Sequence, residues 1–200
     1  MWPACYDANM RTRNSHAGFV LAGGASSRMG KDKASLPFHG RTLVEHIADA
    51  VAEAAGSVTL VGAPERYESL RLPRIPDTRP GCGPLAGIHA ALTASQSDWN
   101  LIVACDMPGI RGALLQTLLS AAEVSDGDCL IPVGPSGRLE PLCAAYHLRC
   151  LDAIGAALDR GVRKVTEGLA SVQIREWPIA ESSWFSNVNT PEEWMRHTHG

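Results

Sequence analysis

The sequence lacks any apolar run that approaches the ~20 residues needed to cross a bilayer. Its first 16 residues have no apolar core of the kind that signal peptides carry. The net charge is only −3, so no excess of either sign points to nucleic acid or to a membrane surface. No internal repeat and no low-complexity linker is present. These absences predict a cytoplasmic protein that binds neither nucleic acid nor membrane.

Paired cysteines are also missing. The chain has six cysteines, but none forms the C-x-x-C pair that is typical of zinc sites. Because no secretion signal is found, these cysteines are more simply interpreted as reduced thiols than as disulfides. This interpretation agrees with a cytoplasmic location.

The apolar pattern alternates between short runs and helical spacing. We predict strands at 19–21, 57–61, 99–105 and 172–177, and helices at 42–55, 84–94, 112–124, 151–160 and 191–196. Two further strands, 129–133 and 142–146, flank a turn and predict an antiparallel excursion. The pattern predicts an α/β three-layer sandwich with a mostly parallel, Rossmann-like sheet. We place a flexible extension at 1–16, one domain at 17–196 and a tail at 197–200.

The first predicted strand runs into a glycine-rich loop within "GFVLAGGASSRMGKDK", residues 18–33. A Walker A loop requires G-x-x-x-x-G-K-[ST]. Here five residues separate Gly24 from Gly30, and Asp32 stands where the magnesium-binding hydroxyl should be. The loop is therefore not a standard P-loop.

The same loop still favours an anionic ligand. Gly23 and Gly24 allow the backbone to approach a ligand and to turn N–H groups toward it. Arg28, Lys31 and Lys33 add positive charge that suits a triphosphate. A structural turn with solvated cations is the alternative.

A second glycine motif, "GCGPLA" at 81–86, opens a predicted helix and matches the dinucleotide fingerprint G-x-G-x-x-[GA]. Asp106 lies 20 residues beyond Ala86. A nicotinamide or flavin enzyme is therefore an alternative. However, the segment before the motif contains Pro73, Pro76 and Pro80, and proline is poorly tolerated in a central strand. A glycine loop that holds another ligand, or a plain helix start, fits better.

Asp106 in "VACDMP" directly follows the most apolar predicted strand. Ligands of open α/β sheets bind beyond the carboxyl ends of the strands. A carboxylate at that position can hold Mg²⁺, which prefers oxygen ligands shared with phosphates. The alternative is a helix N-cap, because Asp caps helices well. Cations at one strand end and a carboxylate at another suit nucleotide–magnesium chemistry.

Together these motifs resemble the molybdenum cofactor guanylyltransferases, nucleotidyltransferases of the glycosyltransferase-A type. "LAGGASSRMGKDK" is similar to the signature L-A-G-G-x-x-x-R-M-G-x-D-K of that family. "GPLAGI", "CDMP", "LEPLCAAYH" and "NVNTPEE" occur in the family's order, and the resemblance covers residues 18–194. It implies transfer of GMP from GTP to molybdenum-loaded molybdopterin, with release of pyrophosphate and with Mg²⁺ as cofactor. It also implies proteins that deliver and receive the cofactor as potential partners.

The resemblance implies roles for individual residues on the nucleotide side. Leu21, Ala22 and Gly23 would contact the guanine and the phosphates through backbone groups. Arg28 and Lys33 would bind the triphosphate and offset charge as the α-phosphorus is attacked, so both are predicted to be catalytic.

Four further residues take roles from the resemblance. Asp77 in "IPD" matches a GTP-binding aspartate of the family, and Asp106 would bind Mg²⁺. Asn187 and Asn189 of "NVNT" would line the reaction centre near the acceptor phosphate. Turn or cap positions are the alternatives for Asp77 and the two asparagines. The acceptor phosphate is already an anionic nucleophile and needs alignment rather than a strong base.

Two departures from the family pattern affect the predicted site. Members can carry Asn where this chain has Gly62, so a contact there is lost or is made by backbone. Related cytidylyltransferases carry an acid where this chain has Asn189, so the presence of a second metal carboxylate stays open. The cytidylyl branch typically has L-A-A-G in the first loop, so Gly23 together with "PLAG" at 84–87 favours guanine over cytosine.

The acceptor side is less distinct in the sequence. Arg138, Glu140 and His147 lie on the antiparallel excursion, where they either face the pterin or are exposed charges of a hairpin. Three other functions stay open: a cytidylyltransferase for the same cofactor, a sugar-phosphate nucleotidyltransferase, and a nucleotide-binding module that has lost catalysis.

Overall fold

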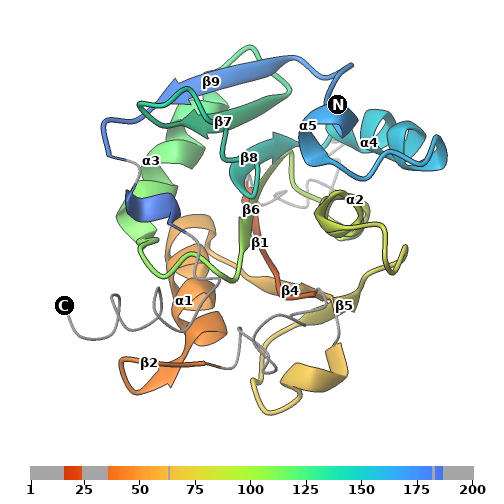
Figure 1. Ribbon diagram of the computed structural model, residues 1–200. Coiled ribbons are helices and arrows are strands. Elements are labelled where there is room, and N and C mark those ends of the chain that lie inside the picture. The colour runs from red at the N-terminus through yellow and green to blue at the C-terminus, as the bar shows by residue number, and fades with distance from the viewer. Residues whose placement is uncertain (1–15, 24–35, 63, 182, 187–200) are drawn as a thin grey trace, which may run out of the picture.

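Seven strands form one sheet in the computed structural model, which describes residues 16–23, 36–62, 64–181 and 183–186 (Figure 1). In spatial order they are β5 (Arg74–Pro76), β4 (Thr59–Gly62), β1 (His16–Leu21), β6 (Trp99–Ala104), β8 (Cys143–His147), β7 (Cys129–Val133) and β9 (Ile174–Pro178). Neighbouring strands of this sheet are parallel except at β8, which is antiparallel to both β6 and β7. The predicted mostly parallel sheet with one antiparallel excursion is confirmed.

Helices cover both faces of the sheet (Figure 1). One apolar core lies between the sheet and α1 (Leu43–Ala55) and α3 (Gly112–Glu123). The other lies between the sheet and α2 (Pro84–Ala94), α4 (Cys150–Asp159) and α5 (Val165–Gly168). The three-layer α/β architecture therefore agrees with the prediction. No helix in the described part of the chain is long and apolar enough to cross a membrane.

The elements absent from the prediction are short. They are β5, the hairpin of β2 (Pro37–Phe38) and β3 (Arg41–Thr42), the 3₁₀ helices η2 (Pro64–Tyr67) and η3 (Ser183–Phe185), and α5. Segments of two to four residues carry too little periodicity to be recognised. β5 contains a proline, which the sheet accommodates because β5 is an edge strand. The helix predicted at 191–196 and most of the predicted extension and tail lie outside the described residues, and β1 begins at His16.

A capping box explains why α1 begins where it does. The Thr42 hydroxyl accepts from the Glu45 backbone N–H at 3.4 Å, and the Glu45 carboxylate accepts from the Thr42 N–H at 2.8 Å. The helix ends at Gly56, which adopts φ +71°. Both ends agree with the prediction from the sequence.

Thr42→Ala is expected to lower the free energy of unfolding by about 1 kcal/mol, because the Glu45 N–H loses its acceptor and the Glu45 carboxylate loses the Thr42 hydroxyl as a donor. Urea unfolding measures the change. The matched control is Thr117→Ala, which removes an exposed hydroxyl inside α3 and is expected to change stability by less than about 0.5 kcal/mol. Equal effects of the two variants would contradict the role of the cap.

Candidate active site

The candidate site lies where the strand order reverses direction along the chain. The chain passes from β1 to β4 and β5 on one side, then returns across β1 to form β6 on the other. Because β5, β4, β1 and β6 are parallel, their carboxyl ends meet at one edge of the sheet. Ligands of open α/β sheets bind at such a switch point.

Backbone hydrogen bonds join these four strand ends directly. They run from Ala22 N–H to Val61 O (2.8 Å), from Cys105 N–H to Leu21 O (3.2 Å) and from Asp77 N–H to Gly62 O (3.3 Å). The predicted nucleotide-binding residues Gly23, Gly62 and Asp77 and the predicted metal ligand Asp106 therefore follow one hydrogen-bonded row. The structure brings these four together, although they are far apart in the sequence.

Gly23 and Gly62 touch each other through their backbones. A Cβ on Gly62 would lie 2.5 Å from both Cα and N of Gly23, and one on Gly23 would lie 3.0 Å from Gly62 Cα. Gly62 also adopts φ +139°, which L side chains rarely adopt. A side chain such as Asn at position 62 would displace the first loop, so any contact of Gly62 with a nucleotide must use its backbone.

Tyr67 fixes the start of the first loop, and sequence analysis missed it. Its buried hydroxyl donates to the Ala22 carbonyl at 3.0 Å, and its own carbonyl accepts from Arg74 Nη1 at 3.0 Å. The contact joins η2 to the end of β1 across 45 positions of sequence. Nothing local in "PERY" indicates it, because only the packing of β4 against β1 brings η2 close.

The backbone of Leu21 and Ala22 is already held by the protein. The single N–H of Ala22 is used by Val61, whereas the carbonyls of Leu21 and Ala22 each retain a second lone pair for a ligand. The Leu21 side chain packs on α2, where a Cβ on Gly87 would lie 3.2 Å from Leu21 Cδ2. The glycine of "PLAG" therefore lets α2 approach β1 closely.

The "GCGPLA" motif forms the turn into α2 rather than a dinucleotide fingerprint. Gly81 and Gly83 adopt φ +78° and +74°, and Pro84 begins the helix. The strand before the motif, β5, lies at the sheet edge, and two strands separate it from β6, which precedes Asp106. A dinucleotide fold requires a central strand before the glycines, so the dehydrogenase alternative does not fit.

Asp77 has a local structural role as well as its place at the site. Its Oδ1 accepts from the Arg79 backbone N–H at 2.8 Å, which is a turn capped by an aspartate. The turn alternative for Asp77 is therefore present in the structure. A carboxylate has several lone pairs, so the turn is compatible with a second contact to a ligand.

Asp106 follows β6 directly and is half-buried, with its Oδ1 atom shielded from solvent. The described residues hold no group of three or more His, Cys, Asp or Glu side chains that would enclose a metal. Mg²⁺ is commonly bound by one or two carboxylates together with substrate phosphates and water. The donor set at this edge therefore fits a magnesium ion shared with a nucleotide.

The remaining predicted residues fall outside the described part of the chain. These are Arg28 and Lys33 of the first loop and Asn187 and Asn189 of "NVNT". Their roles stay predictions.

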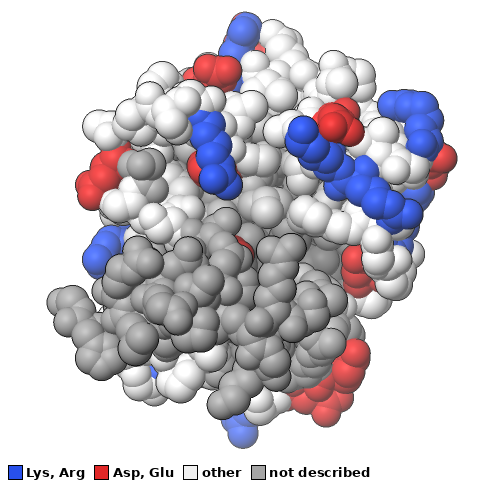
Figure 2. All heavy atoms as spheres, viewed as in Figure 1, with Lys and Arg blue, Asp and Glu red and all other residues white. Residues whose placement is uncertain are grey.

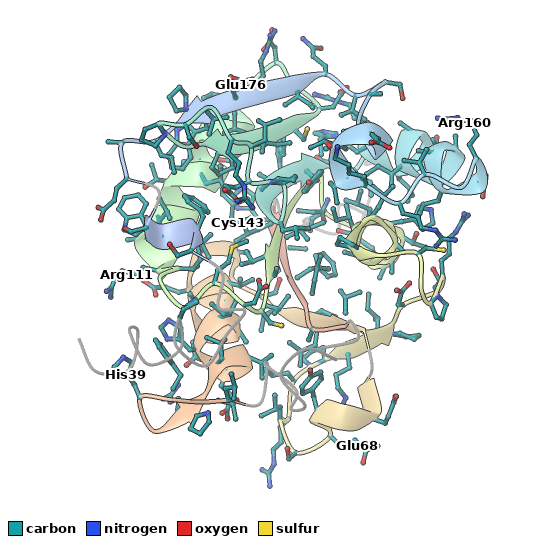
Figure 3. The ribbon with its side chains drawn as sticks, viewed as in Figure 1. His39, Glu68, Arg111, Cys143, Arg160 and Glu176 are labelled. Carbon is teal, nitrogen blue, oxygen red and sulfur yellow. The ribbon has the colours of Figure 1, made fainter. Side chains whose placement is uncertain are left out.

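A pocket of about 610 Å³ opens beside the connection between β7 and β8, on the side of β6 away from β1. It is lined by Pro84 of α2, Met107 beside Asp106, residues 137–142 after β7, and residues 163–166 around the start of α5. Arg138 and Glu140 are among these residues. Cys143, on β8 just behind this segment, lies in the interior of the molecule (Figure 3).

Of the two alternatives for His147, the structure does not support the one in which it faces the pterin. His147 pairs with Trp99 at the start of β6, so it lies at the opposite edge of the sheet from Asp106. The imidazole packs edge-on to the Trp99 indole at 5.2 Å between ring centroids. Burial lowers the pKa of His147 below its usual value. Because β8 is antiparallel to β6, its first residue, Cys143, lies near the carboxyl end of β6 and so near the site. Its last residue, His147, lies at the far end.

Basic side chains gather on the surface over α2, α4 and α5 (Figure 2). Arg160, Arg163 and Lys164 are exposed there, and Arg160 projects outward from the end of α4 (Figure 3). Arg79 forms an ion pair with Asp159, and Lys164 forms one with Glu167, so part of the positive charge of the region is offset. Since two of these cations also line the pocket, its rim favours an anionic ligand.

The sheet, its switch-point site and its glycine-rich first loop define a nucleotidyltransferase. The family model of the MobA-like NTP transferase domain matches residues 18–174, so the chain belongs to that family. A protein of Bacillus cereus (strain AH820) named "Probable molybdenum cofactor guanylyltransferase" is 35% identical over 193 residues, which are 92% of this chain and 96% of that protein.

Solved structures agree with this assignment. Molybdopterin-guanine dinucleotide biosynthesis protein A from Archaeoglobus fulgidus is 28% identical, with a TM-score of 0.78 over 91% of this chain and 96% of that chain. The 2-C-methyl-D-erythritol 4-phosphate cytidylyltransferase of Thermus thermophilus is 18% identical, with a TM-score of 0.69 over 90% of this chain and 96% of that chain. The second likeness is one of fold. The chain is a transferase of the nucleotidyltransferase type.

Proposed function

We propose that this enzyme transfers GMP from GTP to molybdenum-loaded molybdopterin and releases pyrophosphate. The observation that carries the proposal is the hydrogen-bonded row that places Gly23, Gly62, Asp77 and Asp106 at one edge of the sheet. Relatives named molybdenum cofactor guanylyltransferase, which match nearly the whole chain, support the choice of substrates.

The nucleotide occupies the β5–β4–β1 side of Asp106. The glycine pair, Gly23 and Gly62, lets the nucleotide approach the sheet closely. The backbone carbonyls of Leu21 and Ala22 accept hydrogen bonds from it. Arg28 and Lys33 neutralise the triphosphate and the departing pyrophosphate. Asp77 contacts the nucleoside.

The acceptor phosphate attacks the α-phosphorus of GTP, and the bond to the β-phosphate oxygen breaks. No protein nucleophile takes part, since an anionic phosphate needs only alignment and charge neutralisation. Asn187 and Asn189 align the acceptor. Asp106 would hold Mg²⁺, which supplies positive charge to the phosphates when it is bound.

Three neighbouring functions use the same fold. A cytidylyltransferase or a sugar-phosphate nucleotidyltransferase would keep the mechanism and change the substrates, and a silent nucleotide-binding module would keep the nucleotide alone. Gly23 and "PLAG" favour guanine. Cofactor-delivery and acceptor proteins as partners, and a cytoplasmic location, stay predictions.

Pyrophosphate release tests the proposal. The purified chain is incubated with Mg²⁺, molybdenum-loaded molybdopterin and GTP, CTP or ATP in separate reactions. We expect release with GTP at a rate at least about tenfold above the other two, which corresponds to about 1.4 kcal/mol of discrimination. Release with CTP instead would keep the mechanism and reverse the base choice. If no nucleotide gives release, the assay is repeated with sugar phosphates in place of molybdopterin, and release there would replace the proposed acceptor.

A further inference from the structure

Glu140 is a carboxylate set into the wall of the pocket beside Asp106. Its side chain is only 14% exposed, whereas Arg138, whose Nε lies 3.3 Å away, is 70% exposed. Burial raises the pKa of Glu140, and Arg138 opposes this only in part. A buried carboxylate is costly unless hydrogen-bond donors approach it. A ligand in the pocket can supply them.

Hydrogen bonds hold Glu140 in place from both sides. Its N–H donates to Pro132 O at 2.9 Å, and its carbonyl accepts from Cys143 N–H at 3.0 Å. The segment is tied to the site by Ala104 N–H, which donates to Leu142 O at 2.7 Å immediately before Cys105 and Asp106. The carboxylate is therefore carried on a segment between β7 and β8 that is hydrogen-bonded to the end of β6.

The pocket is suited to an anionic ligand that has an apolar ring and hydrogen-bond donors along one edge. Its walls include apolar side chains, its rim carries cations, and Glu140 adds an acceptor. The lining residues used here are Pro84, Met107, Leu139, Leu142, Arg163 and Lys164. An ionised carboxylate accepts hydrogen bonds and donates none, so it pairs with adjacent amino and ring N–H groups. The 2-amino-pyrimidinone edge, shared by guanine and pterins, offers such a pair.

We propose that Glu140 determines acceptor specificity by binding the 2-amino and ring N–H edge of the pterin. The inference rests on the proposed function and names the group that recognises its acceptor. The predicted nucleotide residues follow β5, β4 and β1, whereas Glu140 lies on the connection between β7 and β8, which are on the other side of β6 in the sheet. Glu140 therefore serves the acceptor, with Asp106 between the two sides.

A binding comparison tests the proposal without turnover. Pterin is titrated against lumazine, which has oxygen in place of the 2-amino group, and GTP is titrated separately. We expect the wild type to prefer pterin about ten- to hundredfold, and Glu140→Gln to lose that preference while its GTP affinity is unchanged. Glu176→Gln, the same change at an exposed position on β9 (Figure 3), should keep the preference.

Other results of this comparison overturn the proposal. A loss of GTP affinity in Glu140→Gln would assign the carboxylate to guanine. An unchanged preference, or no measurable pterin binding by the wild type at millimolar concentration, would leave Glu140 as a partner of Arg138 only. Arg138→Ala separates these roles, since it removes the ion pair and should retain the preference for pterin over lumazine. Thermal unfolding confirms that each variant is folded.

A turnover assay adds a second readout. With GTP and molybdenum-loaded molybdopterin, Glu140→Gln should raise the KM of the acceptor about ten- to hundredfold and leave the KM of GTP unchanged. If the wild type shows no turnover with this acceptor, the proposed function fails, and the pterin and lumazine titration still decides the role of Glu140.

Discussion

Asp106→Asn is expected to lower kcat by on the order of 10²–10³-fold or more while the protein stays folded. The substitution keeps the shape of the side chain and removes the charge that would hold Mg²⁺. Asp106 lies at a strand end and is half-buried, outside both apolar cores, so little packing is lost. The measurement is the rate of pyrophosphate release over a range of Mg²⁺ concentrations, together with thermal unfolding.

The control for this experiment is Asp152→Asn, which changes an exposed carboxylate in the first turn of α4. Its rate should equal that of the wild type. Retained activity in Asp106→Asn at ordinary Mg²⁺ concentration would remove the metal assignment. If the wild type and Asp106→Asn both bind GTP and neither turns over, the protein would instead be a nucleotide-binding module.

Gly62→Ala is expected to lower the free energy of unfolding by about 2–5 kcal/mol, from a strained φ and a steric clash together. The new methyl group would lie 2.5 Å from the Gly23 backbone, so the first loop must move. Because a displacement of ~1 Å in an active site can cost about 10²-fold in rate, turnover should also fall in the fraction that folds. Urea unfolding and pyrophosphate release measure the two effects.

Gly40→Ala is the control that separates the cost of a strained φ from the cost of a steric clash. Gly40 also has a positive φ, +81°, but apart from its chain neighbours no atom of the described residues lies within 4 Å of the position that a Cβ would take there. Its cost should be the backbone strain alone, about 1–2 kcal/mol, and its turnover should match the wild type. Equal losses of stability in both variants would show that the contact between Gly23 and Gly62 contributes nothing.

Much of the candidate site could be predicted because its residues follow strands. Gly23, Gly62 and Asp106 stand after predicted strands, whereas Asp77 follows β5, which the sequence did not predict, and was found through the family resemblance; the structure places all four at one edge. Their roles remain predictions. Tyr67 was missed because its only signal is a contact across 45 positions. The two alternatives for His147 stayed open because the sequence of β8 does not show which of its ends faces the site.

The sequence by itself determined the longer elements and, for α1, both ends of the helix. Apolar periodicity and local caps act within a few residues, so α1 with its Thr42–Glu45 box and its Gly56 stop could be predicted directly. Only the tertiary structure decided which strand ends meet, that Gly62 must lack a side chain because Gly23 lies against it, and that Glu140 joins the pocket beside Asp106. These features depend on the order of strands in the sheet, which arises from contacts between segments distant in the chain and leaves no local pattern.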